Sequence, residues 1–481
     1  MILSIDQGTT NSKAILVDEA GQVAGYGAAP VGLASPRPGW IEQDAEAIWA
    51  SVLAAVTGCR ASAPDAALAG VTISNQRESV VAWRRSTGDP LGPVIGWQDR
   101  RTASWCATLA TKDADDQVRA RTGLRIDAMF SAPKLRWLLD HLEGVPRSDV
   151  RLGTVDAWLV WRLTAESTYA CEAGNASRTL LYDVVDLNWS PELCDLFGVS
   201  VETLPAVQPS NGQFGQARGV PGLADGVPIL AVLADSHAAL YGQGCTTVGS
   251  GKATFGTGSS VMTPTETFQA DRTAVPSTLA WVTDRPTYAR EGNILSSGAT
   301  LSWTARTLGL PGVAELAALA AKVPDSDGVV LVPAFAGLGA PYWDREVRAA
   351  LVGMTTSTTR AHLARAALDS VAHQICDVVE EIDQDQPIKA LRADGGATAS
   401  SLLMQTQADL LGRPVDVADV AEVSALGAAH LGWSRLGIQI PPAAAMRSFG
   451  PIMAESERCK RRNQWRQEVA RARQRSGGEG E

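Results

Sequence analysis

Apolar residues at the start of the chain fall in two short runs separated by a polar turn. Residues 2–5 and 13–17 are rich in Ile, Leu and Val, and the segment DQGTTN lies between them. Runs of this length around a glycine-containing turn predict a β-hairpin. The segment GQVAGYGAA at 21–29 predicts a third strand. Residues 44–59 carry apolar side chains at helical spacing behind Asp44, which predicts a capped helix.

The hairpin pattern recurs near the middle of the chain. The segment KATFGTGSSVMTP at 252–264 again predicts a strand, a turn of glycine and hydroxyl residues, and a second strand. Other segments alternate between the two periods, with strands predicted at 68–76, 227–234 and 389–397 and helices at 102–112, 132–142, 313–322, 360–383 and 400–412. Alternation of this kind is typical of an α/β fold. We therefore predict a duplicated α/β fold closing on a cleft, with domains at 1–243 and 244–481.

The C-terminal tail differs in composition from the rest of the chain. From Glu455 onward it contains eight Arg and Lys residues and few apolar ones. Such a segment is typical of a solvated terminal helix that frays, although its basic charge also suits an anionic partner. Of these two interpretations we expect the solvated helix.

Composition limits the class of function. The length of 481 residues favours two domains, and the net charge of −10 disfavours a nucleic acid or an acidic membrane as a partner. The seven cysteines include no CxxC pair, which is typical of reduced thiols in a cytosolic protein. No basic leader with an apolar core and no run of 18 apolar residues is present, so we expect a cytoplasmic protein.

The turn of the first hairpin carries groups that suit phosphate and metal. Asp6 ends the first strand, Thr9 and Thr10 lie in the turn, and Lys13 adds positive charge. Turn amides and hydroxyls donate to phosphate oxygens, and a carboxylate offers the hard oxygen ligands that Mg²⁺ prefers. The alternative is an ordinary turn with an Asx-type hydrogen bond, since the chain has no GxxxxGKS loop. Two further glycine turns, GTG and DGG, suit the same anionic ligand.

Charged residues follow two of the predicted strands. Arg77 and Glu78 follow the strand at 68–76, and Asp235 follows the apolar run that ends at Ala234. Ligand-binding groups in α/β proteins commonly lie at the ends of strands. Asp235 is suited to accept the proton of a hydroxyl that attacks phosphorus, or else to cap the next helix. Trp97 is suited to form an apolar wall for a substrate, or else belongs to the core.

Twelve segments together make the chain similar to the FGGY carbohydrate kinases, and within that family to the glycerol kinases, along almost its whole length. They occur in the family's order and at its spacing: DQGTTNSKA, PGWIEQDAEAIW, NQRE, WQDRRTA, TGLRID, MFSAPKLRWLLDH, GTVDAWLVWRLT, NASRTLL, GTGSS, PAFAGLGAPYWD, DGGA and SALGAAHLG. The resemblance implies two RNase H-like domains of the actin, sugar kinase and Hsp70 superfamily. It also implies that ATP, Mg²⁺ and substrate occupy the interdomain cleft. Family members often form dimers or tetramers, but the sequence shows no interface.

The resemblance also implies a role for each candidate residue. Asp6 matches the residue that organises Mg²⁺, and Asp235 matches the catalytic base that accepts the hydroxyl proton. Arg77 and Glu78 match residues that bind substrate hydroxyls, and Trp97 matches the tryptophan that packs on the carbon chain. The nucleotide-contacting positions of the family fall on Thr9, Thr10, Lys13, Thr257, Gly298, Ser302, Gly396 and Ser400. Glycerol kinases usually have arginine, glutamine and asparagine where this chain has lysine and the two serines of that set.

Three pocket positions depart from the glycerol kinase pattern. Met129, Ser236 and Ser260 stand where glycerol kinases have tyrosine, glutamine and phenylalanine. The smaller side chains leave a larger and partly more polar cavity, so we expect a polyol or ketose of about four or five carbons as substrate. A ketose kinase of the xylulose or ribulose type is the alternative within the family. A non-catalytic regulator that binds a sugar or nucleotide is the alternative outside it, but such a protein does not need Asp235 beside Asp6.

Overall fold

Two mixed β-sheets form the framework of the computed structural model, which describes residues 1–481 except 273, 419–421, 443–444 and 478–481. The N-terminal sheet has the strand order β13-β5-β1-β2-β3, and the C-terminal sheet has the order β16-β17-β15-β14-β20-β21-β22. In the order of the sheets, these strands are β13 (Ile229–Ala234), β5 (Gly70–Asn75), β1 (Ile2–Gln7), β2 (Asn11–Val17), β3 (Val23–Pro30), β16 (Ser277–Val282), β17 (Pro286–Ile294), β15 (Ser259–Thr265), β14 (Ser250–Phe255), β20 (Ala390–Asp394), β21 (Val415–Ala418) and β22 (Ala445–Phe449).

The two sheets repeat one topology, as the recurring hairpin pattern predicted. In the first sheet β1 pairs antiparallel with β2 and parallel with β5. In the second sheet β14 pairs antiparallel with β15 and parallel with β20. Each half therefore opens on a hairpin whose first strand lies in the middle of a sheet. Parallel strands end at the same edge, so the residues that follow β1, β5 and β13 are gathered together, and so are those that follow β14 and β20.

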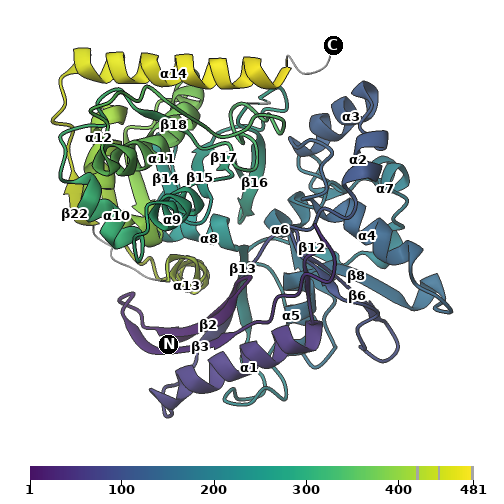
Figure 1. The fold of residues 1–481 in the computed structure, drawn as a ribbon. Helices are drawn as coiled ribbons and strands as arrows, with labels where there is room; N and C mark the ends of the chain where they lie inside the picture. Colours follow the sequence, from purple (N-terminus) through teal and green to yellow (C-terminus); the bar gives the residue numbers. More distant parts are fainter. Residues whose placement is uncertain (273, 419–421, 443–444, 478–481) are drawn as a thin grey trace.

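The N-terminal half carries a second, smaller sheet on one side, seen to the right in Figure 1. Its strand order is β4-β7-β6-β8, formed by β4 (Glu42–Gln43), β7 (Val94–Ile95), β6 (Val80–Arg84) and β8 (Val150–Thr154). The helices of this half are α1 (Ala45–Ala61), α2 (Ala103–Leu109), α3 (Lys112–Thr122), α4 (Ser131–Asp140), α5 (Val155–Leu163), α6 (Ala173–Ser177), α7 (Pro191–Phe197) and α8 (Asp235–Gly242). Asp44 caps α1 as predicted, because its carboxylate accepts a hydrogen bond from the Ala47 amide at 2.7 Å.

The C-terminal half is mainly helical outside its sheet. Its helices are α9 (Gly298–Thr307), α10 (Val313–Ala320), α11 (Arg360–Asp383), α12 (Ser401–Leu411), α13 (Val423–Arg435) and α14 (Glu455–Gly477). Short two-stranded pairs complete the fold: β9 (Ala170–Glu172) with β12 (Ala206–Gln208), β10 (Tyr182–Asp183) with β11 (Asn188–Trp189), and β18 (Val330–Val332) with β19 (Ala350–Val352). Among the described residues, no helix has both the length and the apolar character needed to cross a membrane.

Helix α13 joins the two halves, because it packs against β1, β5, β13 and α8 although it follows the C-terminal sheet in the chain (Figure 1). Gly427 of α13 allows the close approach to α8. A Cβ atom at this position would lie 1.8 Å from the Ala238 carbonyl oxygen, far inside van der Waals contact. Any side chain here would therefore push α13 away from the start of α8, which carries Asp235.

The expectation of a solvated, fraying tail is wrong. Helix α14 runs along one side of the C-terminal half (Figure 1), and its Trp465, Val469 and Ala472 side chains are buried. Arg462 is buried as well, because its guanidinium donates to Asp377 at 2.6 Å and to Glu380 at 2.8 Å, both on α11. One face of the tail helix therefore belongs to the core of this half, and its basic residues dominate the other face.

Candidate active site

The two carboxylates predicted at the ends of strands line one cavity of about 260 Å³ between the halves. Asp6 comes from the end of β1, and Asp235 is the first residue of α8, directly after β13. The C-terminal half contributes Lys252 and Thr254 of β14 and Asp394 of β20. The sequence did not single out Lys252 or Asp394. Lys252 begins the strand predicted at 252–264, so a charged residue in that strand could have been singled out from the sequence.

Asp6 lies in the middle of the N-terminal sheet, between β2 and β5. The Ser74 hydroxyl donates to Asp6 Oδ1 at 2.8 Å, and no described residue donates to the second carboxylate oxygen. Burial raises the pKa of Asp6 to about 7, and the charge of Asp235 adds to this increase while the Ser74 hydrogen bond opposes it. Lys13 is the cross-strand partner of Asp6, and its ammonium lies 2.7 Å from Glu422.

Asp235 is not a helix cap, because Ala234 occupies the cap position and no side chain caps α8. The Asp235 carboxylate instead accepts the Ser236 amide at 2.6 Å and lies 3.4 Å from Arg77 Nε. Its side chain is 38% exposed, so a ligand in the cavity can reach it. Burial raises the pKa of Asp235 above its ordinary value, although Arg77 opposes that increase.

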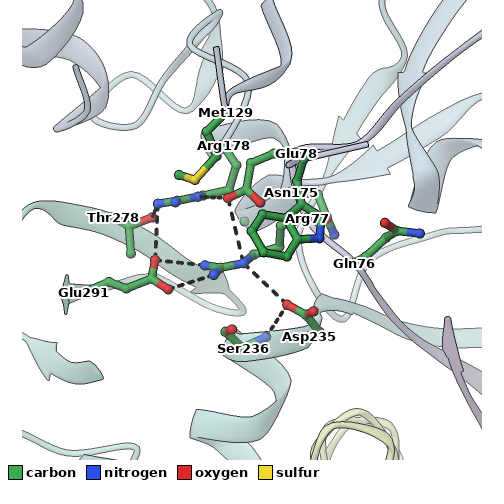
Figure 2. Close-up of polar contacts among 12 residues, drawn as sticks. Gln76, Arg77, Glu78, Met129, Asn175, Arg178, Asp235, Ser236, Thr278 and Glu291 are labelled. Carbon is green, nitrogen blue, oxygen red and sulfur yellow. Dashed lines mark hydrogen bonds and ion pairs between the residues drawn. The ribbon is translucent and has the colours of Figure 1, made fainter. Parts of the chain in front are cut away.

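Arg77 belongs to a network of buried charges that spans the two halves (Figure 2). Its guanidinium donates twice to Glu291 on β17, at 2.8 and 2.7 Å. Arg178 donates to Glu78 at 2.7 Å and lies 3.3 Å from Glu291. Burial by itself would raise the pKa of Glu291, but Arg77 and Arg178 hold that pKa well below its usual range. Arg178 and Glu291 were missed by sequence reasoning, because nothing near them in the chain indicates their partners.

The predicted pocket residues lie on different sides of this network. Ser236 lines the cavity of Asp6 and Asp235, whereas Met129 lines a second pocket of about 200 Å³ together with Arg178 and Glu291. Ser260 is buried on β15 and lines neither of these two cavities.

Trp97 lies at the first hairpin and is not a core residue. Its side chain is 37% exposed, and its indole N–H donates to Thr9 Oγ1 at 3.0 Å. The buried Lys134 ammonium holds two neighbouring segments in place by donating to the Met129 carbonyl at 2.7 Å and to the Gly96 carbonyl at 3.3 Å. Burial lowers the pKa of Lys134 to about 7, although nearby carboxylates oppose the decrease. The Lys134 side chain therefore positions both Gly96, the residue before Trp97, and the backbone of Met129.

Three of the residues predicted to contact nucleotide, Thr257, Gly298 and Ser302, lie in the second hairpin or on the helix beside it. Thr257 is exposed in its turn, and the Thr257 carbonyl accepts the Ala299 amide at 3.0 Å, which places the start of α9 against this turn. Gly298 is needed there, since a Cβ atom would lie 2.5 Å from the Gly256 carbonyl oxygen. Ser302 follows on α9 and is half-buried.

The DGGA turn lies against the end of β14. A Cβ atom on Gly395 would lie 2.6 Å from the Phe255 carbonyl oxygen, and the neighbouring Gly396 is exposed. Ser400 caps α12 by accepting the Leu403 amide at 3.2 Å, so its hydroxyl already has a structural role. In the first hairpin, Thr10 is exposed and the Thr9 carbonyl accepts a hydrogen bond from Gln43.

The carboxylate oxygens at Asp6 fit a magnesium site of the kind found in phosphoryl-transfer enzymes. Among the described residues, no three or more His, Cys, Asp or Glu side chains are grouped to hold a metal. Mg²⁺ in such sites needs only one or two protein carboxylates, because substrate phosphates and water complete its shell. Asp6 has one carboxylate oxygen without a protein donor, and this residue and Asp235 line the same cavity.

Comparison with known proteins agrees with this geometry. The model of the FGGY family of carbohydrate kinases, N-terminal domain, matches residues 1–242, and that of the C-terminal domain matches residues 251–435. A glycerol kinase of Aromatoleum aromaticum and an apulose kinase of Pectobacterium atrosepticum are each 44% identical to the chain, over 98% of both sequences. The crystal structure of Plasmodium falciparum glycerol kinase with ADP superposes with a TM-score of 0.92 at 28% identity and 98% coverage of both chains. The resemblance inferred from the twelve segments is therefore confirmed: the chain belongs to the FGGY family of carbohydrate kinases, as a glycerol kinase-like phosphotransferase that uses an alcohol group as acceptor.

Proposed function

We propose that the chain transfers the terminal phosphoryl group of Mg²⁺-bound ATP to a hydroxyl of a polyol or ketose of about four or five carbons. The observation that carries this proposal is the cavity shared by Asp6 and Asp235, which lies where the two halves meet. One carboxylate is suited to hold the metal and the other to take a proton, as transfer from a nucleotide to an alcohol requires.

Asp235 acts as the general base in this proposal. The acceptor hydroxyl loses its proton to the Asp235 carboxylate as its oxygen bonds to the phosphorus of the terminal phosphate. The bond between that phosphorus and the bridging oxygen breaks, and ADP leaves with the electron pair. Arg77, 3.4 Å from Asp235 Oδ1, and the Ser236 amide, which donates to the same oxygen, hold the carboxylate in place. A raised pKa makes Asp235 a better proton acceptor than an ordinary aspartate.

Asp6 would hold Mg²⁺, which neutralises charge on the phosphates when bound. Lys13 and Lys252 bring positive charge to the same cavity. Thr9 and Thr10 at the first turn, and Thr257, Gly298, Ser302, Gly396 and Ser400 around the second, would bind the nucleotide. The amides and hydroxyls of both turns then stabilise the charge that develops on the transferring group.

The substrate size follows from the pocket. Arg77 and Glu78 would bind substrate hydroxyls, Trp97 would pack on the carbon chain, and the small side chains of Ser236 and Ser260 leave room for additional carbons. The relative named apulose kinase, whose ending denotes a ketose, is as similar to this chain as the relative named glycerol kinase. Both a ketose and a polyol are therefore consistent with the relatives.

The test measures ADP release from ATP and Mg²⁺ with glycerol and with a panel of four- and five-carbon polyols and ketoses. Asp235→Asn should lower kcat roughly 10²–10⁴-fold, the usual contribution of a positioned base. Asp225→Asn is the matched control, since Asp225 lies in a surface loop where it accepts the Gly219 amide. Activity that survives in Asp235→Asn would refute the assigned base. A kcat/KM for glycerol orders of magnitude above every longer compound would refute the substrate size.

A further inference from the structure

A row of three side chains crosses the C-terminal sheet between the two cavities. Thr254 on β14 pairs with Ser260 on β15, and Ser260 pairs with Asn293 on β17. Side chains directly opposite on antiparallel strands point to the same face of a sheet. Thr254 lines the cavity of Asp235, and Asn293 lines the pocket of Met129. Ser260 therefore lies at the boundary between the two spaces.

The row of three side chains also sets the distance between the two cavities across the sheet. Neighbouring strands are about 4.8 Å apart, so the distance from Thr254 to Asn293 is about 10 Å. A five-carbon chain with its terminal oxygens spans roughly 7 Å at ordinary bond lengths, and a three-carbon triol spans roughly 5 Å. A five-carbon chain therefore covers more of the distance along this row than a triol does.

The Arg77 side chain extends from Asp235 in the first cavity toward Glu291 in the second. Its Nε lies 3.4 Å from Asp235, and its two terminal nitrogens donate to Glu291, which lines the second pocket. Glu291 and Asn293 are two residues apart on β17 and so point to the same face. In Figure 2 Met129 lies on the opposite side of this network from Asp235. A ligand that follows Arg77 from Asp235 therefore arrives between Met129 and Asn293.

Asn293 has an unused hydrogen-bonding side chain. Its backbone carbonyl accepts the Ala340 amide at 2.9 Å, which fixes the strand, but its carboxamide makes no hydrogen bond to any described residue. The two carboxylates that line this pocket are already paired: Glu291 with Arg77 and Arg178, and Asp127 with Arg100 at 2.7 Å. The remaining lining includes Arg125 and Arg345 and the apolar side chains of Phe130, Pro276, Leu295 and Trp343. A half-buried carboxamide in such a pocket offers both a donor and an acceptor to a neutral polar ligand.

We propose that Asn293 is a specificity-determining residue that binds an oxygen on the carbon farthest from the phosphorylated hydroxyl of a five-carbon ketose or polyol. This inference rests on the proposed function. Met129 closes the pocket on the other side with a flexible apolar side chain. Ser260 matters because its small size keeps the passage open. A larger residue there would separate the second pocket from Asp235.

The experiment compares kcat/KM for glycerol and for five-carbon ketoses and polyols in wild type, Asn293→Ala and Ser260→Phe. For the best five-carbon substrate, Asn293→Ala should lower kcat/KM roughly 10-fold, mainly by raising KM, while kcat/KM for glycerol changes less than about 3-fold. Ser260→Phe should lower the five-carbon value at least as much and shift preference toward glycerol. Asn188→Ala, on the exposed side of β11, is the matched control and should leave kcat/KM unchanged for both substrates.

Thermal unfolding midpoints separate a binding effect from a folding defect, and Asn293→Ala should unfold at the wild-type temperature. An equal loss for glycerol and for five-carbon substrates, or no loss in Asn293→Ala, would overturn the role of Asn293 while leaving the kinase assignment intact. A wild-type protein that phosphorylates no compound of the panel would instead overturn the proposed function and this inference with it.

Discussion

Glu291→Gln tests whether the buried charges between the two halves stabilise the fold. Glu291 is 2% exposed and accepts two hydrogen bonds from Arg77, while Arg178 lies 3.3 Å away. The substitution keeps the size and one acceptor oxygen but removes the negative charge. Arg178 would keep Glu78 at 2.7 Å, whereas Arg77 would keep only the partly exposed Asp235 and the more distant Glu78.

The expected cost in unfolding free energy is large because the nearly buried Arg77 would lose its closest charged partner. Removing one partner of a buried ion pair usually costs about 3–5 kcal/mol, whereas an exposed pair contributes only about 0–1 kcal/mol. The pair of Glu46 with Arg162 in the N-terminal half is the exposed counterpart, since the Glu46 side chain is 51% exposed. Glu46→Gln should therefore change the free energy of unfolding by less than about 1 kcal/mol, and Glu291→Gln by about 3–5 kcal/mol.

Urea unfolding followed by both tryptophan fluorescence and far-ultraviolet circular dichroism measures these free energies. Two probes are needed because a chain of two halves can unfold in more than one step. The double variant Glu291→Gln with Arg77→Met removes the carboxylate together with the cation that loses its closest partner, so it should recover part of the loss. A cost for Glu291→Gln no larger than that of Glu46→Gln would refute the reasoning, because the network would then be as solvated as a surface pair.

Two further predictions concern the tail helix and the metal site. Trp465→Ala should lower the free energy of unfolding by about 3–5 kcal/mol, because Trp465 is 1% exposed and its indole N–H donates to Asp377; a loss below about 1 kcal/mol in the same urea assay would contradict the packing of α14. The pKa of Asp6 is about 7 in the fold and 3.8 unfolded, so the folded state retains a proton that the unfolded state loses, and metal-free stability should fall as pH rises from about 4 to 7. Asp6→Asn should remove that part of the slope, and an unchanged slope would exclude Asp6 as its source.

Local signals in the sequence were sufficient for much of the fold. The two hairpins and the cap of α1 depend on residues that are neighbours in the chain, so periodicity and turn composition predicted them. Asp6 and Asp235 were also accessible to this reasoning, since each follows a buried strand and parallel strands deliver such residues to one edge. The tail was predicted as a helix, which α14 confirms, but its packing was not foreseen, because its eight basic residues dominate its composition and only the spacing of Trp465, Val469 and Ala472 indicates a buried face.

The charge network marks the limit of sequence reasoning at this site. Arg178 is 100 residues from Glu78, and Glu291 is 214 residues from Arg77. A buried charge is stable only with its partner, and no local pattern identifies a partner at such a distance. Arg77 and Glu78 could therefore be predicted as ligand groups from their place after a strand, but their pairing with Arg178 and Glu291 could not be foreseen. That pairing leaves less of each charge free for a ligand, so the substrate must find its remaining contacts elsewhere in the pocket.

Sequence comparison was also limited in what it could predict about the substrate pocket. Met129, Ser236 and Ser260 could be compared with the family by size alone, which predicts how much volume is gained but not where it lies. The location of the added volume depends on strand register, which places Ser260 opposite Thr254 on one side and Asn293 on the other. A one-residue shift of β17 against β15 would turn Asn293 to the opposite face and bring Gly292 or Ile294 opposite Ser260 instead. We therefore expect preference for chain length to depend on the register between β15 and β17, and to change with substitutions in that pair of strands more than with equal changes at the rim of the cleft.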